Sequence, residues 1–298
     1  MNQATCAQAL SAAQTLGLER LDAQWLLLHA LGKPISDRAW LLAHDTDHLT
    51  NEVEDRFRGL SLRRASGEPL AYIVGSKEFF GLNLQVDARV LVPRPDTETL
   101  VQWSLDVLLA PAMPAAPDIL DLGTGSGAIA LALAHGLRPA GRDARVLAVD
   151  ASADALAVAR ENASRLGLKL AFLESGWLQH VKGSFHLIAS NPPYIASADP
   201  HLAALVHEPL QALAAGADGL DDIRQIIAQA GAHLHPGGWL LLEHGYDQSA
   251  QVRELLREGG FTHVQSRLDL AGIERCSGGQ WAPPLADPVG SGTSGRQR

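Results

Sequence analysis

The chain has 298 residues, which is the length of about two domains of ordinary size. It is 46% hydrophobic and 19% charged, and its 33 Asp and Glu outnumber its 24 Lys and Arg, for a formal net charge of -9. This composition is typical of a globular protein with a sizeable core and argues against a surface that grips nucleic-acid phosphates. With only Cys6 and Cys276, it also excludes a disulfide scaffold or a structural zinc site.

The N-terminal segment has neither a basic start nor a sustained apolar run, so no signal peptide is recognisable. Apolar runs elsewhere are far shorter than the roughly 20 residues that a membrane span requires. We therefore expect a soluble cytoplasmic protein that does not bind a membrane.

Residues 1–75 show the pattern of a small helical domain. Leu21, Trp25 and Leu28 fall on one helical face. Ser36 is a suitable cap for the helix that follows, and Thr50 is a suitable cap for the next one. The domain holds seven basic and nine acidic residues, so we expect it to dock a partner protein rather than clamp nucleic acid.

Short β-prone runs then alternate with glycines. The runs are 72–74, 79–80 and 90–92, and Gly75 and Gly81 separate them. This pattern predicts a β-hairpin linker over residues 76–96. Thr97 is a candidate cap for the helix beyond it.

Strands and helices alternate over residues 97–282, which predicts a Rossmann-like α/β domain. Its sheet should be open and mostly parallel, with helices on both faces. The predicted strands are 119–122, 145–150, 170–173, 185–190, 239–243 and 263–268, and the predicted helices are 128–135, 155–166, 220–234 and 250–257. Residues 283–298 are rich in Gly, Ser and Pro, and we expect a disordered tail there.

A glycine-rich loop, Asp121-Leu122-Gly123-Thr124-Gly125-Ser126-Gly127, follows the first of these strands, at the edge where doubly wound sheets bind ligands. Asp150 ends the next strand, 23 residues after Gly127, near the spacing at which an acid binds ribose hydroxyls. The acid at Asp121 suits a ligand with an ammonium and a sulfonium group better than a pyrophosphate. A structural explanation stays open for each feature. The glycines can serve only to pack the turn closely, and Asp150 can serve as the cap of the helix that begins near Asp154.

A second motif, Asn191-Pro192-Pro193-Tyr194, follows the strand over 185–190 and so lies at the same sheet edge. Its two prolines fix the backbone. The Asn191 side-chain oxygen and the Pro192 carbonyl would accept both protons of one planar NH2 group, on which Tyr194 can stack. An amide nitrogen is a poor nucleophile, and aiming it at a methyl donor favours transfer without a metal. The structural alternative is a proline-rich turn with an asparagine cap.

Together these motifs resemble the PrmC/HemK family, the protein-(glutamine-N5) methyltransferases that act on peptide chain release factors. The resemblance covers the ordered chain and includes Gly67-Glu68-Pro69, residues 93–98, the glycine loop, Asn191–Tyr194 and Pro236-Gly237-Gly238. It implies a helical substrate-docking domain, a hairpin linker and a seven-stranded catalytic domain. The implied reaction is methylation of the glutamine in the release-factor GGQ motif, with S-adenosyl-L-methionine as cofactor.

The resemblance also implies roles for individual residues. Because a sulfonium brings its own leaving group, we expect no metal. The implied cofactor contacts are Gly123, Thr124, Gly125, Ser126, Gly127, Asp150, Trp177 and Asn191. The implied substrate contacts are Asn191, Pro192, Pro193 and Tyr194, of which Asn191, Pro192 and Tyr194 are the catalytic residues. From the residues alone, Trp177 is equally well explained as part of the core.

Two other functions are compatible with the same motifs. An adenine-N6 nucleic-acid methyltransferase would grip the adenine amine with Asn191–Tyr194, but a flipped base needs a basic groove that the acidic chain does not offer. A non-catalytic nucleoside-binding adaptor would have no use for a rigid acceptor motif. We therefore expect a release factor as partner, no direct nucleic-acid contact and a monomer.

Three further features receive a structural interpretation or stay open. Gly278-Gly279-Gln280 copies the GGQ motif, and we interpret it as a coincidence in an edge strand. His233 and His235 lack a third ligand at metal spacing. Arg94 and Glu98 either close over the cofactor or form a salt bridge in the linker.

Overall fold

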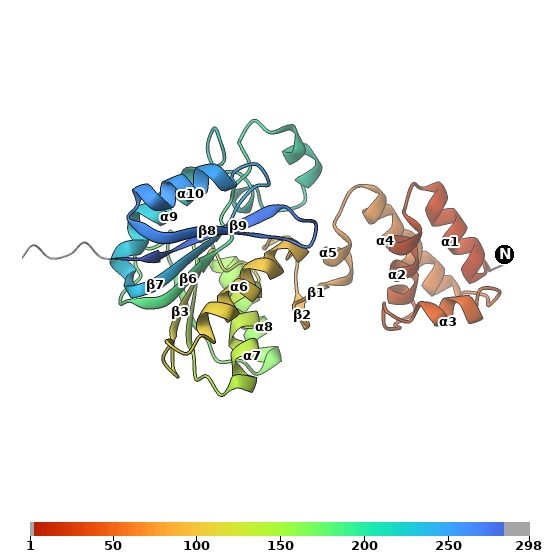
Figure 1. Ribbon diagram of the computed structural model, residues 1–298. Coiled ribbons are helices and arrows are strands. Elements are labelled where there is room, and N and C mark those ends of the chain that lie inside the picture. Colours follow the sequence, from red (N-terminus) through yellow and green to blue (C-terminus); the bar gives the residue numbers. More distant parts are fainter. Residues whose placement is uncertain (1–2, 283–298) are drawn as a thin grey trace, which may run out of the picture.

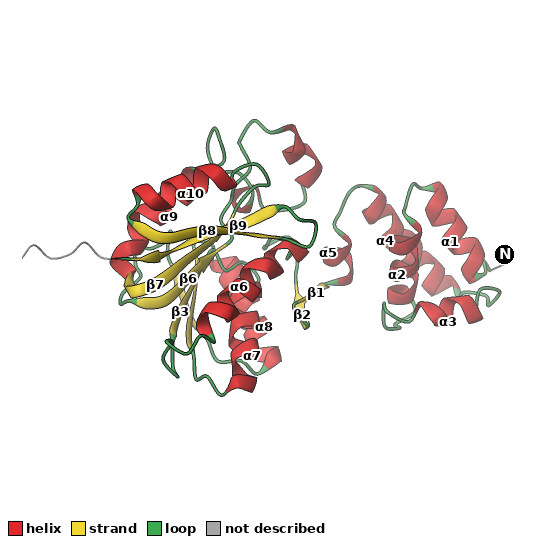
Figure 2. Cartoon of the chain, viewed as in Figure 1, coloured by secondary structure: helices red, strands yellow, loops and turns green. Residues whose placement is uncertain are grey.

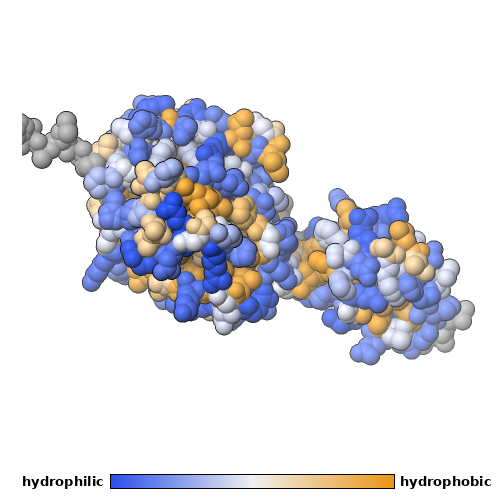
Figure 3. All heavy atoms as spheres, turned by 60° about the horizontal axis from the view of Figure 1, so that its bottom comes forward, coloured by the Kyte–Doolittle hydropathy of each residue, from blue (hydrophilic) through white to orange (hydrophobic). Residues whose placement is uncertain are grey.

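The computed structural model describes residues 3–282, so the tail predicted over 283–298 lies outside the described residues. The chain forms two lobes joined by a narrow waist (Figure 1, Figure 3). The smaller lobe is helical and consists of α1 (Cys6–Thr15), α2 (Arg20–Ala30), α3 (Arg38–Ala43), α4 (Asn51–Ala65) and α5 (Leu70–Val74). Among the described residues, no helix combines the length and the apolar character that crossing a bilayer requires.

Side-chain caps fix where three helices of the smaller lobe begin, and Thr5 caps α1. Thr50 caps α4, as predicted. At α3 the cap is Asp37, whose carboxylate accepts the Trp40 backbone N–H at 3.2 Å. The prediction that Ser36 caps this helix is therefore wrong by one residue.

The buried face of α2 is wider than predicted. Leu28 is buried, but Leu21 is 41% exposed. Because α2 contacts α1, α3 and α4, it needs a broad apolar surface rather than a single row of side chains. This surface consists of Ala23, Leu26, Leu27, Leu28 and Ala30.

The waist differs from the predicted linker in two places. Residues 72–74 belong to the short helix α5, which Gly75 ends in the left-handed conformation (φ 75°), and do not form a strand. The hairpin contains only β1 (Ser76–Phe79) and β2 (Leu82–Gln85), so residues 90–92 are not part of it. Helix α5 serves both lobes, since Ile73 packs in the core of the smaller lobe and Tyr72 packs with Val158 of the larger one.

The larger lobe is built on a seven-stranded sheet with the order β5-β4-β3-β6-β7-β9-β8. Figure 2 shows this sheet in yellow between red helices. The five strands β5, β4, β3, β6 and β7 run parallel, and β9 is antiparallel to its neighbours β7 and β8. The predicted open, mostly parallel sheet is confirmed. Its strands are β3 (Asp118–Leu122), β4 (Arg145–Asp150), β5 (Ala171–Glu174), β6 (Phe185–Ser190), β7 (Leu234–Glu243), β8 (Phe261–Leu268) and β9 (Glu274–Trp281).

Helices cover both faces of this sheet, as predicted. Side chains of α6 and α7 pack in one apolar cluster with β3, and side chains of α9 and α10 pack in a second cluster with β6 and β7. The helices are α6 (Glu98–Leu108), α7 (Ala128–Leu137), α8 (Ala153–Leu166), α9 (Asp221–Ala230) and α10 (Ser249–Glu258). Short 3-10 turns are η1 (Pro95–Thr97), η2 (Arg138–Ala140), η3 (Pro200–Leu205), η4 (Leu210–Ala212) and η5 (Gly231–His233).

The Gly278-Gly279-Gln280 segment lies in β9, which is an interior strand, so its predicted position at the sheet edge is wrong. A Cβ at Gly278 would lie 2.6 Å from the carbonyl oxygen of Leu240, so the close approach to β7 requires glycine. The Gln280 side-chain nitrogen donates to the Gly237 carbonyl at 2.7 Å. Sheet packing therefore accounts for these residues.

Candidate active site

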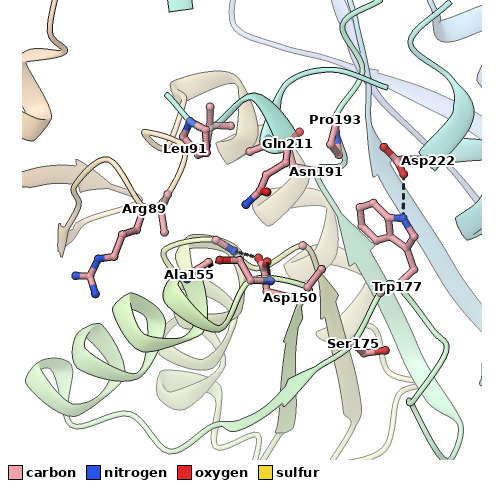
Figure 4. A pocket seen from close by; sticks show the side chains of 18 residues that line it. Arg89, Leu91, Asp150, Ala155, Ser175, Trp177, Asn191, Pro193, Gln211 and Asp222 are labelled. Carbon is pink, nitrogen blue, oxygen red and sulfur yellow. Dashed lines mark hydrogen bonds between the residues drawn. The ribbon is translucent and has the colours of Figure 1, made fainter. Parts of the chain in front are cut away.

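A cavity of about 470 Å³ lies at the carboxyl ends of β3, β4 and β6, which is a typical volume for a small-molecule site. Figure 4 shows Asn191 on one side of it and Asp150 on the other. Six of the residues predicted from the sequence line this cavity: Gly123, Gly125, Asp150, Trp177, Asn191 and Pro193. The fold thus brings the glycine loop and the acceptor motif to one pocket.

The other predicted residues surround the cavity without lining it. Thr124, Ser126 and Pro192 are buried. Gly127 is the N-cap of α7, and a Cβ there would lie 2.9 Å from the Leu131 side chain, so this glycine serves close packing. Tyr194 packs against the apolar cluster under α9 and α10.

The glycine loop adopts a backbone conformation that side chains oppose. Gly123 has φ 70° and Gly125 has φ 54°, both in the left-handed region. A Cβ at Gly123 would lie 3.3 Å from the Trp177 ring, whereas nothing lies within 4 Å of a Cβ at Gly125. At Gly125 the loop therefore presents bare backbone to open space, which is what a closely held ligand needs.

Asp121 lies beneath the loop and does not line the cavity. Its Oδ2 accepts the Thr124 hydroxyl at 2.7 Å and the Ala130 backbone N–H at 3.1 Å, so it ties the loop to the first turn of α7. Its Oδ1 has no hydrogen-bond partner among the described residues. Burial raises the pKa of Asp121 to about 7, although both hydrogen bonds act in the other direction.

Asp150 connects the loop to the next strand. Its Oδ2 accepts the Gly125 backbone N–H and its Oδ1 accepts the Ser152 backbone N–H, each at 2.9 Å. Burial raises the pKa of Asp150, and these hydrogen bonds oppose the shift. Each carboxylate oxygen keeps a second lone pair, so two ligand hydroxyls can still be accepted. The cap of α8 is Ser152, so Asp150 is not needed as the cap.

Trp177 forms a wall of the cavity that lies directly against the Gly123 end of the loop. Its indole N–H donates to Asp222 at 2.9 Å (Figure 4). The backbone of Trp177 has φ 50°, which is uncommon for a residue with a bulky side chain. The side chain lines the cavity and also packs against the apolar cluster of the sheet, so both interpretations of this residue hold in part.

Asn191 enters the cavity directly after β6. Its Nδ2 donates to the Thr97 hydroxyl oxygen at 3.2 Å. This bond occupies the donor end of the amide and leaves Oδ1, an acceptor, for other partners. Thr97 precedes α6 but makes no side-chain cap bond, so its predicted capping role is wrong.

Part of the wall consists of residues that were not predicted to belong to the site, although Pro209 and Ala212 lie in motifs shared with the resembled family. These lining residues come from the segment after the hairpin, from the loop around η4 and from the start of α9: Arg89, Val90, Leu91, Pro209, Gln211, Ala212 and Asp222. They meet the glycine loop only because the fold closes over it. Glu243 does not line the cavity but accepts the Tyr194 hydroxyl at 3.4 Å, and it ends a predicted strand at the carboxyl edge of the sheet.

Arg94 and Glu98 are held in contacts of the linker. Arg94 pairs with Glu208 at 2.5 Å, and Glu98 accepts the Phe80 backbone N–H at 3.1 Å. Neither residue lines the cavity. The salt-bridge alternative is therefore the one that the structure favours for Arg94.

A cluster of Asp118, His186 and His235 lies at the opposite edge of the sheet, with ligand atoms within 4.8 Å of one another. Both Asp118 oxygens accept Arg145 N–H groups at 2.6 Å, and the Asp118 backbone N–H donates to His186 Nδ1 at 3.0 Å. The Arg145 guanidinium neutralises the Asp118 carboxylate, and the Nδ1 lone pair of His186 is already used. Side-chain pairing within the protein thus accounts for the cluster, whose members come from three strands and have no sequence spacing.

Comparisons with known protein families agree on both lobes. The PrmC N-terminal domain family matches residues 3–75, and the methyltransferase small domain family matches residues 105–218. The release factor glutamine methyltransferase of Burkholderia pseudomallei is 48% identical over 287 residues, which is 93% of this chain and 96% of that protein. The protein of the same description from Bordetella pertussis is 48% identical over 88% of this chain and 95% of its own length.

Solved structures resemble the fold at low sequence identity. A methyltransferase from Pyrococcus furiosus has a TM-score of 0.51 at 18% identity, covering 68% of this chain and 90% of that one. The hMettl16 catalytic domain, solved with the MAT2A 3'UTR hairpin 6, has a TM-score of 0.53 at 17% identity, covering 80% of this chain and 85% of that one. At this identity the likeness concerns the fold alone.

Proposed function

The chain belongs to the release factor glutamine methyltransferases, which depend on S-adenosylmethionine, and on that basis we propose that Asn191 and Pro192 hold the glutamine amide of a release factor beside the methyl donor. The observation that carries this proposal is the hydrogen bond from Asn191 to Thr97. It leaves the Asn191 Oδ1 acceptor free at a cavity that the glycine loop also lines.

The residues present fit the cofactor. Gly123 and Gly125 offer bare backbone, and Asp150 keeps lone pairs for two ribose hydroxyls. Trp177 offers an aromatic wall for the adenine. Asp121 is fully buried beneath the loop, so it supports the loop rather than meeting the ligand as the sequence predicted. When bound, S-adenosylmethionine supplies a methyl group on a sulfonium sulfur, and this sulfur is left as a neutral thioether once the methyl group has been transferred.

The protein's own contribution is to position the acceptor amide. Asn191 Oδ1 accepts one N–H of the glutamine side chain and the Pro192 carbonyl accepts the other, so the nitrogen is fixed with one face toward the methyl group. Orientation of this kind contributes about 7–11 kcal/mol to lowering a barrier. The nitrogen forms one bond to carbon and releases one proton, which leaves along these acceptors to water.

We assign the remaining parts of the chain accordingly. Residues 1–75 dock the release factor, 76–96 form the linker and 97–282 carry out methyl transfer to the glutamine of its GGQ motif. The His207 side chain contacts the Ser66 carbonyl at 3.2 Å, which supports a fixed position of the docking lobe near the site. We further propose that the protein acts as a cytoplasmic monomer and does not bind nucleic acid, which its formal net charge of -9 favours.

The test is methyl transfer from labelled cofactor to three acceptors in parallel: a release factor, a free glutamine peptide and duplex DNA. We expect label on the release factor. Label on the DNA alone would support the adenine-N6 alternative and contradict the proposal.

Asn191→Ala tests the role of the acceptor motif. It should lower turnover on the order of 10²–10³-fold, as loss of one aimed hydrogen-bonding group does, while calorimetry shows cofactor affinity largely unchanged. Asn83→Ala, at an exposed position of β2, is the matched control. Equal loss of affinity and turnover would show that Asn191 chiefly binds the cofactor.

A further inference from the structure

Two short runs of chain from distant parts of the sequence form one side of the cavity. Residues 89–91 follow the hairpin, and three residues of the run 209–212 lie at η4. Figure 4 shows Leu91 and Gln211 above the cavity and Asp150 below it. Neither run belongs to the sheet or to an α-helix, so the position of each depends on other contacts. We call these two runs the roof of the cavity.

Glu208 joins the two parts of the roof. It directly precedes the run 209–212, and its side chain is only 3% exposed. Its Oε2 accepts the backbone N–H of Val92, which directly follows the other run, at 3.1 Å. Its Oε1 accepts an N–H of the Arg94 guanidinium. A carboxylate is buried at tolerable cost only when it is paired and hydrogen-bonded, and here both of its partners lie on the segment after the hairpin.

Contacts with the smaller lobe hold the roof as well. The Tyr72 hydroxyl, on α5, donates to the carbonyl of the lining residue Val90. The His207 side chain, next to Glu208, contacts the Ser66 carbonyl at the end of α4. Each run is thereby attached to the smaller lobe, and Glu208 attaches the runs to each other.

We propose that Glu208 is a positioning residue that holds the roof closed over the bound cofactor. The inference rests on the proposed function, since it takes this cavity to be the site of S-adenosylmethionine. Glu208 itself does not line the cavity, so it acts through the lining residues Leu91 and Pro209. The apparent affinity of a ligand falls with the fraction of protein in the competent conformation, so a roof that opens more often weakens cofactor binding.

Glu208→Gln tests this role because it keeps the shape of the side chain and leaves only one acceptor oxygen. When that oxygen faces Val92, the NH2 group faces the Arg94 guanidinium, and the reverse orientation places NH2 against the Val92 N–H. One of the two bonds is lost in either case. The cofactor Kd should rise on the order of 10-fold, as for one lost hydrogen bond to a charged group. With saturating cofactor, kcat should change little, because the acceptor motif is intact.

Two variants of Arg94 test the same link from its other end. Arg94 donates to Glu208 through one nitrogen, so a lysine can still supply a positively charged donor. Arg94→Ala should raise the cofactor Kd as Glu208→Gln does, and Arg94→Lys should recover most of the affinity. Asp118→Asn is the matched control, because Asp118 pairs with Arg145 at 2.6 Å at the opposite edge of the sheet. It should leave the cofactor Kd unchanged.

Calorimetry with S-adenosylmethionine gives the Kd, labelled methyl transfer to a release factor gives kcat, and thermal unfolding shows whether each variant folds. An unchanged Kd in a folded Glu208→Gln overturns the inference, and so does an equal rise of the Kd in Asp118→Asn. A lower Tm with an unchanged Kd also overturns it, since it would show a role in stability alone.

The Arg94 variants keep the test decisive if Glu208→Gln does not fold, because the Arg94 side chain is 37% exposed. An unchanged Kd in Arg94→Ala, or an equal loss of affinity in Arg94→Lys, then overturns the inference. Failure of the proposed function is recognised separately. Full activity in Asn191→Ala refutes that function, whereas the role of Glu208 is decided by cofactor affinity.

Discussion

Gly219 offers a way to displace the acceptor motif from outside it. Its φ is 76°, and a Cβ there would lie 2.1 Å from the Tyr194 carbonyl oxygen and 2.9 Å from Gln248 Nε2. Gly272, in the turn between β8 and β9, is a matched control. Its φ is 80°, and nothing lies within 4 Å of a Cβ built there.

The two alanine variants share one cost and differ in another. Placing alanine in the left-handed region costs about 1–2 kcal/mol, so both should lose about that much free energy of unfolding. Only Gly219→Ala must also separate its Cβ from the Tyr194 carbonyl, and reaching ordinary contact requires a shift of roughly 1 Å. A displacement of roughly 1 Å at a positioning segment lowers rates on the order of 10²-fold.

Urea denaturation gives the free energy of unfolding of each variant, and labelled methyl transfer gives its turnover. We expect Gly272→Ala to be less stable but fully active, and Gly219→Ala to be both less stable and on the order of 10²-fold slower, with unchanged cofactor affinity. Equal turnover in the two variants would refute the view that the position of Tyr194 controls the acceptor site.

Three other predictions concern cofactor binding and stability. Asp150→Asn should weaken cofactor binding by about 10-fold, because a charged acceptor is lost. Asp150→Ala should also lower the free energy of unfolding, because the Gly125 and Ser152 amides lose their acceptor. Unchanged cofactor affinity in calorimetry would exclude the ribose role. Trp177→Phe keeps an aromatic wall but loses the bond to Asp222, so the cofactor Kd should rise about 5-fold, and no change would argue for a purely structural residue. The folded-state pKa of Glu243, about 7, lies above its usual 4.5, so the folded protein holds a proton that the unfolded chain has released, and stability falls as pH rises through this window. Between about pH 5.5 and about pH 8 the free energy of unfolding of the unmodified protein should therefore fall by about 2 kcal/mol more than that of Glu243→Gln. Parallel curves of stability against pH for the two proteins would show that burial does not raise the pKa of this carboxyl group.

The sequence determined those features that a few neighbouring residues encode. The strand and helix alternation predicted the open sheet, and the glycine loop, Asp150 and Asn191 were predicted at one edge because parallel strands present their carboxyl ends together. Each of these signals is local, since it rests on side-chain periodicity, on turn chemistry or on the residue that ends a strand.

Where several local conformations were compatible with the residues, tertiary packing decided. Residues 72–74 are β-prone but form helix α5, which lets Ile73 and Tyr72 serve the cores of different lobes. The Gly278-Gly279-Gln280 segment reads as an edge strand, yet it lies between β7 and β8 because the last strand inserts antiparallel into the sheet.

The parts of the site that orient the acceptor motif were also beyond the sequence. Asn191 and Thr97 are 94 residues apart, and Tyr194 and Glu243 are 49 residues apart, so no spacing rule connects them. Whether a buried carboxyl group meets a hydroxyl or only apolar side chains depends on which faces of distant elements come into contact. Local chemistry therefore specified which groups stand at the edge of the sheet, and only the packed fold decided which end of the Asn191 amide faces the cavity.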